Sequence, residues 1–484
     1  MPPLYDWLVQ YWHFSPMWAA LIAVVVPCLV VFLAIQGVAG FSTYVERKIA
    51  ADIQRRVGPN KCNVNAFFGD FGRIVIESAK GPKAGIPTKV LAMVLKPALP
   101  LFKFLDKVLP PGILIFLADG IKLIMKEDII PDPADKPLFK LAPTVVLASS
   151  FGALAVLPYS DAWYVADFNI GIFYIAAITS IEVLGILMAG WASNNKWALL
   201  GGMRSAAQIV SYELPVGLAI LTGIAISGTL SMQGMTYDQF GAPLATSGSW
   251  SSGWFWQWNL FHPAMFILAP VYFLAALAEC NRTPFDIPEA ESELVSGYHT
   301  EYCGMRFAFF FMGEYAMMCV TSAIATTLFL GGWSTGIAPI EHFVMNAPET
   351  WASASVPEFA WYGTLLHLIA FVTKTYFLVF IMMWIRWTLP RFRVDQMMTL
   401  CWKKLIPLSI ACFTGVCVWQ LARMFLVERI GAGTLDTITF WLRLFFGIGV
   451  VGYLVWYFTK PLTKEQVDQR EMLAKSNMNA GMAM

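Results

Sequence analysis

The chain has 484 residues, of which 57% are hydrophobic and 13% are charged, and its formal net charge is +1. The mean hydropathy of +0.60 excludes a water-soluble protein of this length and is typical of polytopic membrane proteins. The apolar runs are long and do not alternate, which excludes an outer-membrane β-barrel. The sequence therefore predicts an all-α, multi-pass membrane protein with no nucleic-acid partner.

Nine stretches are apolar enough to form membrane-spanning helices, since a span needs roughly 20 apolar residues. Lys and Arg are concentrated in every second connecting segment, which places the N-terminus outside and the C-terminus in the cytoplasm. No cleavable signal is evident, and the first span is long enough to stay in the membrane. The predicted spans lie at approximately 17–41, 141–158, 170–191, 205–230, 261–277, 306–330, 361–388, 405–425 and 438–459.

The long cytoplasmic segment after the first span opens with a short amphipathic helix. Ile49 and Ile53 lie on one face of this helix, basic residues are available for the other face, and Gly58-Pro59 ends it. Residues 61–117 contain no run that is long and uncharged enough to span comfortably. We interpret them as interfacial helices, a loop packed on a neighbouring subunit, or a re-entrant pair around 88–117.

A further helix is predicted within Leu117–Asp128. Asp119, Lys122, Lys126 and Glu127 allow i,i+3 and i,i+4 pairs on one face of this helix. On spacing alone, the segment is a surface helix that these ion pairs stabilise.

Four ionisable residues lie well inside predicted spans, where charge is costly. They are Glu182, Glu213, Glu314 and Lys374. Such residues normally face the bundle interior or water, and clustered buried carboxyl groups can hold and release protons near neutral pH. They are candidates for a proton path, with Lys374 as a candidate counter-ion; the alternative for any one Glu is a polar contact that only orders the helices. Arg386, Arg423 and Arg443 lie nearer span ends, where a long side chain can snorkel to the interface.

The most informative segment is the acidic stretch Ala278–Tyr302, between the fifth and sixth predicted spans. A membrane protein has little reason to place many carboxylates beside hydrocarbon unless they have a function. The alternative is a solvated cytoplasmic loop whose charges only face water. The stretch holds the cation Arg282 and six carboxylates: Glu279, Asp286, Glu289, Glu291, Glu293 and Glu301.

No redox centre or metal site is predicted. The eight cysteines include no CxxC pair, the five histidines show no paired ligand spacing, and no GxGxxG or Walker motif is present. Several cysteines lie inside predicted spans, where Cys behaves as a small apolar residue. We therefore expect no covalently bound cofactor in this chain.

Five sequence blocks resemble, in the same order, the motifs of the H subunit of bacterial respiratory complex I, the family that also contains mitochondrial complex I membrane subunit 1. The blocks are Tyr44–Asn60, Ala118–Glu127, Gly190–Glu213, Ala278–Tyr302 continuing into Phe309–Tyr315, and Lys374 with Leu389–Gln396. The fourth block matches nearly throughout. A single block such as Gly-Pro-Asn carries little weight, but the set is highly specific.

The resemblance implies a membrane subunit of proton-pumping NADH:quinone oxidoreductase, not catalytic alone, in the bacterial plasma membrane. Its partners would be hydrophilic-arm quinone-reductase subunits, small and antiporter-like membrane subunits, the lipid bilayer, and quinone as a substrate at the interface with another subunit. That other subunit supplies the hydrogen bonds to the quinone headgroup. Arg282 would order the acidic loop by pairing with carboxylates.

The resemblance also assigns roles to individual residues. It places the quinone chamber at Glu46, Arg47, Gln54, Arg55, Asp119, Arg282, Phe285 and Asp286, and the proton path at Glu213, Glu279, Glu289, Glu291, Glu293, Glu301, Glu314 and Lys374.

The chain departs from the family pattern in places. Glu182 stands where the family usually has a small or apolar residue, and Leu184 where a Tyr is common. Glu182 is expected to add a polar contact, and a relay role for it is a further hypothesis. Residues 1–410 would form the family's eight-helix membrane domain with an insertion at 61–117, residues 411–459 would complete the eighth span and add a ninth, and residues 460–484 would be a cytoplasmic tail.

Two other functions remain open at this point. One is the related membrane subunit of an energy-converting hydrogenase, which takes no quinone; the intact run Asn281–Glu291 favours the quinone-type branch. The other is a stand-alone ion or solute transporter. No inverted internal repeat is evident, and long cytoplasmic loops are typical of a chain that binds partners, which disfavours the transporter.

Overall fold

The structure is a computed structural model that describes residues 37–63, 110–160, 164–240, 254–288, 291–337 and 360–430, together with the single positions 107, 439, 441, 445 and 449. Within these ranges every regular element is a helix and no strand occurs. The predicted all-α class is therefore confirmed for the part of the chain that is described.

Six helical runs are long and apolar enough to cross a membrane. They correspond to the predicted second, third, fourth, sixth, seventh and eighth spans; the shorter apolar helix α10 (Pro263–Glu279) corresponds to the fifth. The first predicted span, apart from residues 37–41, and nearly all of the ninth lie outside the described residues. The six runs are α6 (Lys136–Leu154), α7 (Gly171–Ala192), α8 (Lys196–Ser227), α12 (Gly304–Phe329), α14 (Ala360–Thr388) and the run that contains α16 (Ile406–Ile430).

Two of these helices begin earlier than hydropathy predicts. α8 starts at Lys196, where the Asn195 side chain accepts a hydrogen bond from the Trp197 backbone N–H at 2.9 Å, the usual form of an N-cap. α16 continues from α15 (Val394–Leu400) through the π-helical turn η6 (Cys401–Leu405). In both cases basic residues in the first turns lower the local hydropathy without interrupting the helix, so the hydropathy pattern underestimates its length.

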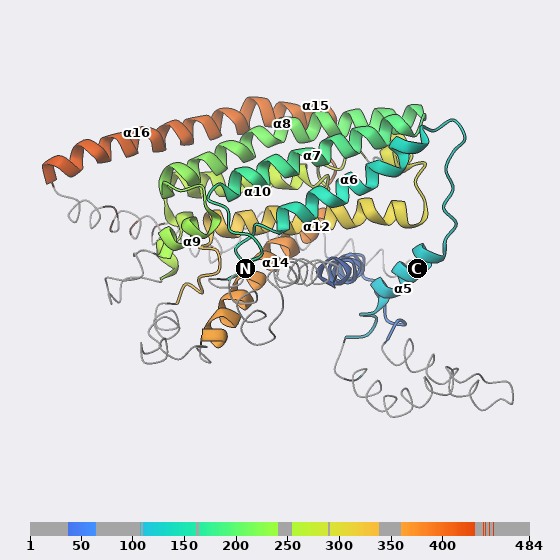
Figure 1. Cartoon of the computed structure of the whole chain (residues 1–484), viewed down its shortest axis with the longest axis horizontal. Coiled ribbons are helices and arrows are strands. Elements are labelled where there is room, and N and C mark those ends of the chain that lie inside the picture. Colours follow the sequence, from blue (N-terminus) through green and yellow to red (C-terminus); the bar gives the residue numbers. More distant parts are fainter. Residues whose placement is uncertain are drawn as a thin grey trace, which may run out of the picture.

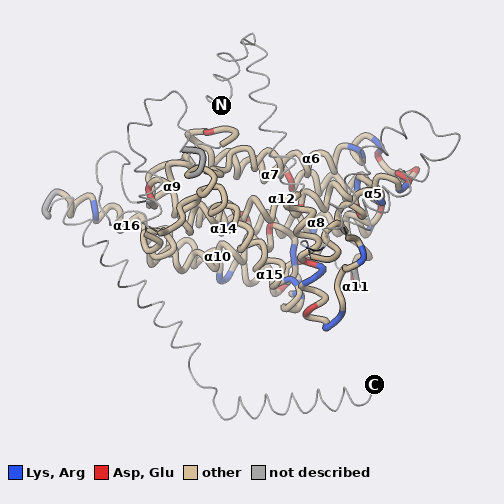
Figure 2. Tube along the Cα trace, turned by 90° about the horizontal axis from the view of Figure 1, so that it is seen from below, with Lys and Arg blue, Asp and Glu red and all other residues tan. Residues whose placement is uncertain are grey.

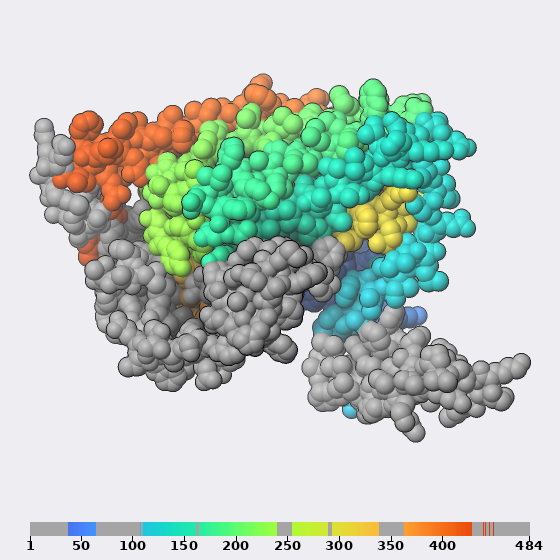
Figure 3. Space-filling view, in the orientation of Figure 1, coloured from blue at the N-terminus to red at the C-terminus, as the bar shows by residue number. Residues whose placement is uncertain are grey.

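The long helices form one bundle in which α6, α7, α8, α10, α12 and α16 run side by side, and α14 crosses them (Figure 1). α12 lies at the centre, because most of its residues are buried, whereas few residues of α14 and α16 are buried. The face drawn in Figure 3 is made in turn by α16, α8, α7 and α6. Small residues allow close approach: a Cβ at Gly190 of α7 would lie 2.8 Å from the Ala198 carbonyl oxygen of α8.

Charged residues are concentrated at one end of the bundle, around α5 (Ile115–Met125), α11 (Glu291–Leu294) and α15 (Figure 2). We call this the charged end. α6, α8 and α12 begin there, and α7, α10 and α14 end there. The segments that the sequence predicts to be cytoplasmic thus share one end, and the middle of the bundle carries few charges.

Candidate functional site

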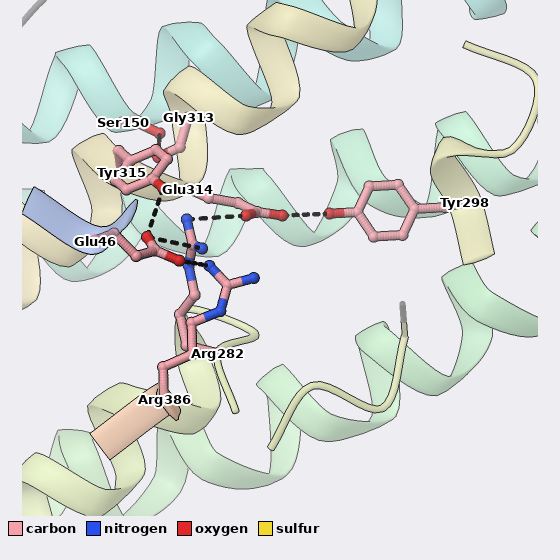
Figure 4. A network of polar contacts seen from close by, with 8 residues as sticks. All are labelled: Glu46, Ser150, Arg282, Tyr298, Gly313, Glu314, Tyr315 and Arg386. Carbon is pink, nitrogen blue, oxygen red and sulfur yellow. Dashed lines mark hydrogen bonds and ion pairs between the residues drawn. The ribbon is translucent and has the colours of Figure 1, made fainter. Parts of the chain in front are cut away.

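A buried cluster of two arginines and two glutamates lies near the charged end (Figure 4). Glu46 comes from the helix over residues 37–53, Arg282 from the turn after α10, Glu314 from α12 and Arg386 from the last turn of α14. Arg386 lies 2.5 Å from Glu46, and Arg282 lies 3.9 Å from Glu46 and 3.3 Å from Glu314. The pairing expected for Arg282 is present, and the two carboxylates of these ion pairs, Glu46 and Glu314, come from outside the acidic stretch.

Two tyrosines complete this cluster through their hydroxyl groups, and one of them also contributes its ring. Tyr315 donates to Glu46 at 2.6 Å, and Tyr298 donates to Glu314 at 3.2 Å. The Arg282 guanidinium also lies over the Tyr315 ring, 4.4 Å from its centroid. Arg282 is only 2% exposed, so its charge is removed from water and depends on these partners, as buried ion pairs generally do.

The turn that carries Arg282 is held by Gln208 of α8. The Gln208 Nε2 donates to the carbonyl oxygens of Ala278 at 2.8 Å and of Phe285 at 2.7 Å. Asn281 adopts a left-handed conformation with a φ of 50°, which reverses the chain. Phe285 is fully buried between the rings of Tyr212 and Phe392. These contacts direct Arg282 into the bundle.

A cavity of about 100 Å³ lies deeper, between α7, α8, α10 and α12. Its polar lining comprises Thr179, Glu213, Tyr272, Glu279 and Thr321, and the rest of the wall is aliphatic. Ser180 donates to Glu213 at 2.5 Å. The Oε2 atom of Glu279 is buried and has no hydrogen-bond partner among the described residues. The cavity has room for several water molecules, and its carboxylates are the kind of polar partner that buried water needs.

Most of the other predicted chamber residues lie at the outer edge of the charged end. Arg47 pairs with Asp119 at 2.6 Å, which joins the helix over residues 37–53 to α5. Lys122 also contacts Asp119 at 3.1 Å, so the predicted i,i+3 pair is present. Gln54 accepts a hydrogen bond from Arg56, and Arg55 follows the end of the helix in the left-handed region with a φ of 53°.

The carboxylates of the acidic stretch do not form a single group in the described part of the chain. Asp286 pairs with Arg391 at 3.1 Å, Glu293 with Arg204 at 2.7 Å, and Glu301 accepts from the Asn195 side chain at 2.7 Å. Glu289 and the Glu291 side chain lie outside the described residues.

At the end of the acidic stretch, Tyr302 stacks on Phe139 with ring centroids 4.0 Å apart. Burial raises the pKa of its phenol well above the ordinary value, so this hydroxyl stays neutral.

Lys374 lies apart from the other predicted proton-path residues. Its Nζ donates to the carbonyl oxygens of Leu330 at 2.6 Å, Gly332 at 3.2 Å and Ser334 at 2.5 Å, just beyond the end of α12 that is remote from the charged end. It also lies 4.1 Å from the centroid of the Trp258 ring. The structure therefore brings Lys374 to a helix C-terminus, where a cation satisfies free carbonyl groups, and not to a buried glutamate of the described bundle.

Several site residues were not singled out by sequence reasoning. Arg386 was expected to reach the interface, yet it points inward to Glu46. Tyr298 and Tyr315 lie within the quoted motifs, but nothing in their spacing indicates a carboxylate partner. An Arg in the last turn of an apolar span can point outward to the membrane interface or inward to the bundle. The sequence pattern does not indicate which of the two occurs.

Fold and site together define a polytopic helical membrane protein that holds compensated charges and further carboxyl groups inside its bundle. A family model described as NADH dehydrogenase matches residues 106–417. The H subunit of NADH-quinone oxidoreductase from Anaeromyxobacter dehalogenans is 40% identical over 86% of this chain and 85% of its own length. The corresponding H subunits of Chlorobaculum parvum and Geobacter sulfurreducens (the one numbered 1) are 48% identical over 64% of this chain and 80% of theirs, and 37% identical over 82% and 95%.

The chain therefore belongs to the family of NADH-quinone oxidoreductase H subunits, which are membrane subunits of respiratory complex I.

Proposed function

We propose that this chain forms the quinone-access chamber of a proton-pumping NADH:quinone oxidoreductase and couples quinone reduction to proton movement through its buried carboxylates. The observation that carries the proposal is that Arg282 of the paired cluster lies in the turn directly after α10, while Glu279, the last residue of α10, lines the cavity together with Glu213. A chain of ionisable groups that leads from one end of a membrane bundle into its interior is typical of a proton path.

The entrance of the chamber is proposed at the outer edge of the charged end. The Arg47–Asp119 pair joins the helix over residues 37–53 to α5 there, and Arg282 of the turn after α10 lies 3.9 Å from Glu46 of the same helix. Quinone is proposed as a substrate at the interface with a hydrophilic-arm subunit, and no resident redox cofactor is assigned to this chain.

Coupling is proposed to be electrostatic. Reduction of a quinone changes the charge in a poorly screened space, and such a change alters the protonation of nearby carboxyl groups. Glu314 lies between the Arg282 guanidinium and the Tyr298 hydroxyl (Figure 4), and Glu213 and Glu279 line the cavity. Because these groups interact, protons enter and leave the set as a whole.

The remaining assignments follow from membership of complex I. NADH is proposed as the electron donor of the whole complex, as the names of the relatives state for those proteins. The proton path would continue from this chain into small and antiporter-like membrane subunits. The chain would lie in the bacterial plasma membrane with its N-terminus outside, its C-terminus in the cytoplasm and the charged end facing the cytoplasm.

The test is Glu279→Gln in the complete complex in native membranes. The amide keeps the volume but cannot release a proton, so quinone-dependent NADH oxidation or proton uptake by inverted vesicles should fall by about tenfold or more. NADH oxidation by a hydrophilic acceptor, which bypasses quinone, reports assembly and should stay at the wild-type rate.

Asp128→Asn is the matched control, because Asp128 lies in an exposed ion pair with Arg306. Wild-type quinone reduction and wild-type pumping in Glu279→Gln would overturn the proposed function. Co-purification of the tagged chain with a nickel–iron hydrogenase subunit, or as a stable single species, would do so as well.

A further inference from the structure

Glu182 is a buried carboxylate that the proposed path does not yet use. It lies in α7 and is 5% exposed. Thr179, one helical turn earlier on the same face, lines the cavity, and Ser180 donates to Glu213. α7 ends at the charged end, so Glu182 lies between the cavity wall and that end of the bundle.

The close packing of α7 and α12 on α6 brings Glu182 towards Glu314. The methyl groups of Val146 in α6 fill the space beside two glycines: a Cβ at Gly185 would lie 2.6 Å from Val146 Cγ2, and a Cβ at Gly313 would lie 2.8 Å from Val146 Cγ1. Gly185 is one turn after Glu182, and Gly313 precedes Glu314. One side chain therefore separates the two backbones at the level of these carboxylates.

The titratable surroundings of Glu182 are acidic. Glu213 faces the cavity from α8, Glu279 from α10, and Glu314 lies on α12 with Tyr298 of the η4 turn (Gly297–His299). Glu182 is close enough to Glu279 and Glu314 for their charges to interact. The charged residues of α6, Lys136 and Lys140, lie in its first two turns. Among the described residues no Lys or Arg forms an ion pair with Glu182.

We propose that Glu182 is a proton-relay residue that connects Glu314, at the paired cluster, with Glu279 and Glu213 in the cavity. The proposal rests on the proposed function and adds a step to it. An O–H bond breaks at one carboxyl group while another forms at the next, directly or through a cavity water, so no redox partner is needed. Glu182 suits this position because no described cation fixes its charge, whereas Glu314 is held by Arg282.

Leu184 is the second position of α7 that departs from the family pattern, and its side chain does not belong to the proposed path. Leu184 is 58% exposed and lies on the outer face of the bundle. Glu182 and Leu184 therefore face opposite surroundings, and only Glu182 is placed where it can take part in the path.

The experiment compares Glu182→Gln, Glu182→Asp and Glu279→Gln in the complete complex in native membranes. We expect Glu182→Gln to oxidise NADH normally with a hydrophilic acceptor, while quinone reduction or the number of protons pumped per electron falls by about tenfold or more. Glu182→Asp retains a carboxyl group and should restore most of the function, with a shifted pH profile.

Each outcome decides the question. Wild-type rate, pumping and pH profile in Glu182→Gln, together with a loss in Glu279→Gln, would overturn the relay and leave the proposed function standing. Equal loss in Glu182→Gln and Glu182→Asp, accompanied by lowered assembly, would overturn it in favour of a structural contact. If Glu182→Gln does not assemble, the pH profile of Glu182→Asp decides: a shifted profile supports the relay, and an unchanged one overturns it.

Discussion

The bundle contains two sets of buried or partly buried carboxylates that differ in whether a cation lies beside them. Glu46 and Glu314 lie beside Arg282 and Arg386 and accept hydrogen bonds from tyrosines. The set of Glu182, Glu213 and Glu279 has no ion pair with a Lys or Arg of the described residues. Within the same ranges Glu213 accepts a hydrogen bond from the Ser180 hydroxyl, and one oxygen of Glu279 has no hydrogen-bond partner.

In the path proposed above, this difference distinguishes carboxylates that lie beside arginines from carboxyl groups that no described cation pairs. Two arginines lie beside two carboxylates, so opposite charges compensate one another in the paired cluster, which joins four segments that are far apart in sequence. Carboxyl groups without a cation are free to gain and lose protons as their surroundings change. Arg282, which pairs with Glu314 of the first set, lies in the turn directly after Glu279 of the second set.

The largest effect is expected from Arg282→Met, which breaks the paired cluster. Glu314 then loses the cation that lies 3.3 Å from it, and an uncompensated buried charge costs about 3–5 kcal/mol. We expect little assembled complex, measured by the rate of NADH oxidation with a hydrophilic acceptor and by the thermal unfolding midpoint of purified material. A stable complex with normal quinone reduction would show that the cluster is not a structural unit.

A smaller effect is expected from Gly313→Ala, which disturbs the spacing between the two sets. The new Cβ would lie 2.8 Å from Val146 Cγ1, and overpacking of this kind costs about 1–3 kcal/mol. The double variant Gly313→Ala/Val146→Ala removes the clash and should recover stability beyond the sum of the single effects. Additive losses would mean that Val146 does not set the distance between α7 and α12.

The spans could be predicted from the sequence, because a run of roughly 20 apolar residues has few other stable environments. The partners inside the bundle could not. Glu46 and Arg386 are 340 residues apart, and no periodicity relates them. The direction of Arg386 depends on where the helix over residues 37–53 packs, which is a property of the tertiary structure.

In the acidic stretch, too, the sequence does not predict which side chains contact one another, although they belong to one segment. Its carboxylates are close in sequence, and the resemblance assigns them to the quinone chamber and the proton path. In the structure Gln208 holds the turn that reverses the chain after α10, so Arg282 turns inward while Asp286 meets Arg391 and Glu301 meets Asn195. Closeness in sequence indicates a shared region, but the turn geometry decides which groups share an environment.

Lys374→Met sharpens the comparison, because it asks whether a partly buried cation remote from both sets belongs to the path. Lys374 binds three backbone carbonyl groups beyond the end of α12, and charged hydrogen bonds of this kind contribute about 1.5–3 kcal/mol each at most. We expect lower thermal stability, with a normal number of protons pumped per electron in the complex that assembles. A reduced proton number in a fully assembled complex would instead place Lys374 in the path.

The smallest effect is expected from Asp128→Asn, which removes an ion pair at the charged end without touching either set. Asp128 pairs with Arg306 at 2.8 Å, and its side chain is 46% exposed, so water and salt screen the attraction and the pair contributes at most about 1 kcal/mol. Arg306 stays in place because its guanidinium also lies 5.7 Å from the centroid of the Phe139 ring. The thermal unfolding midpoint and quinone reduction, measured at low and high ionic strength, should match the wild type closely. A loss as large as that of Arg282→Met would show that exposure does not decide the contribution of these ion pairs, and the distinction between the two buried sets would then need another physical basis.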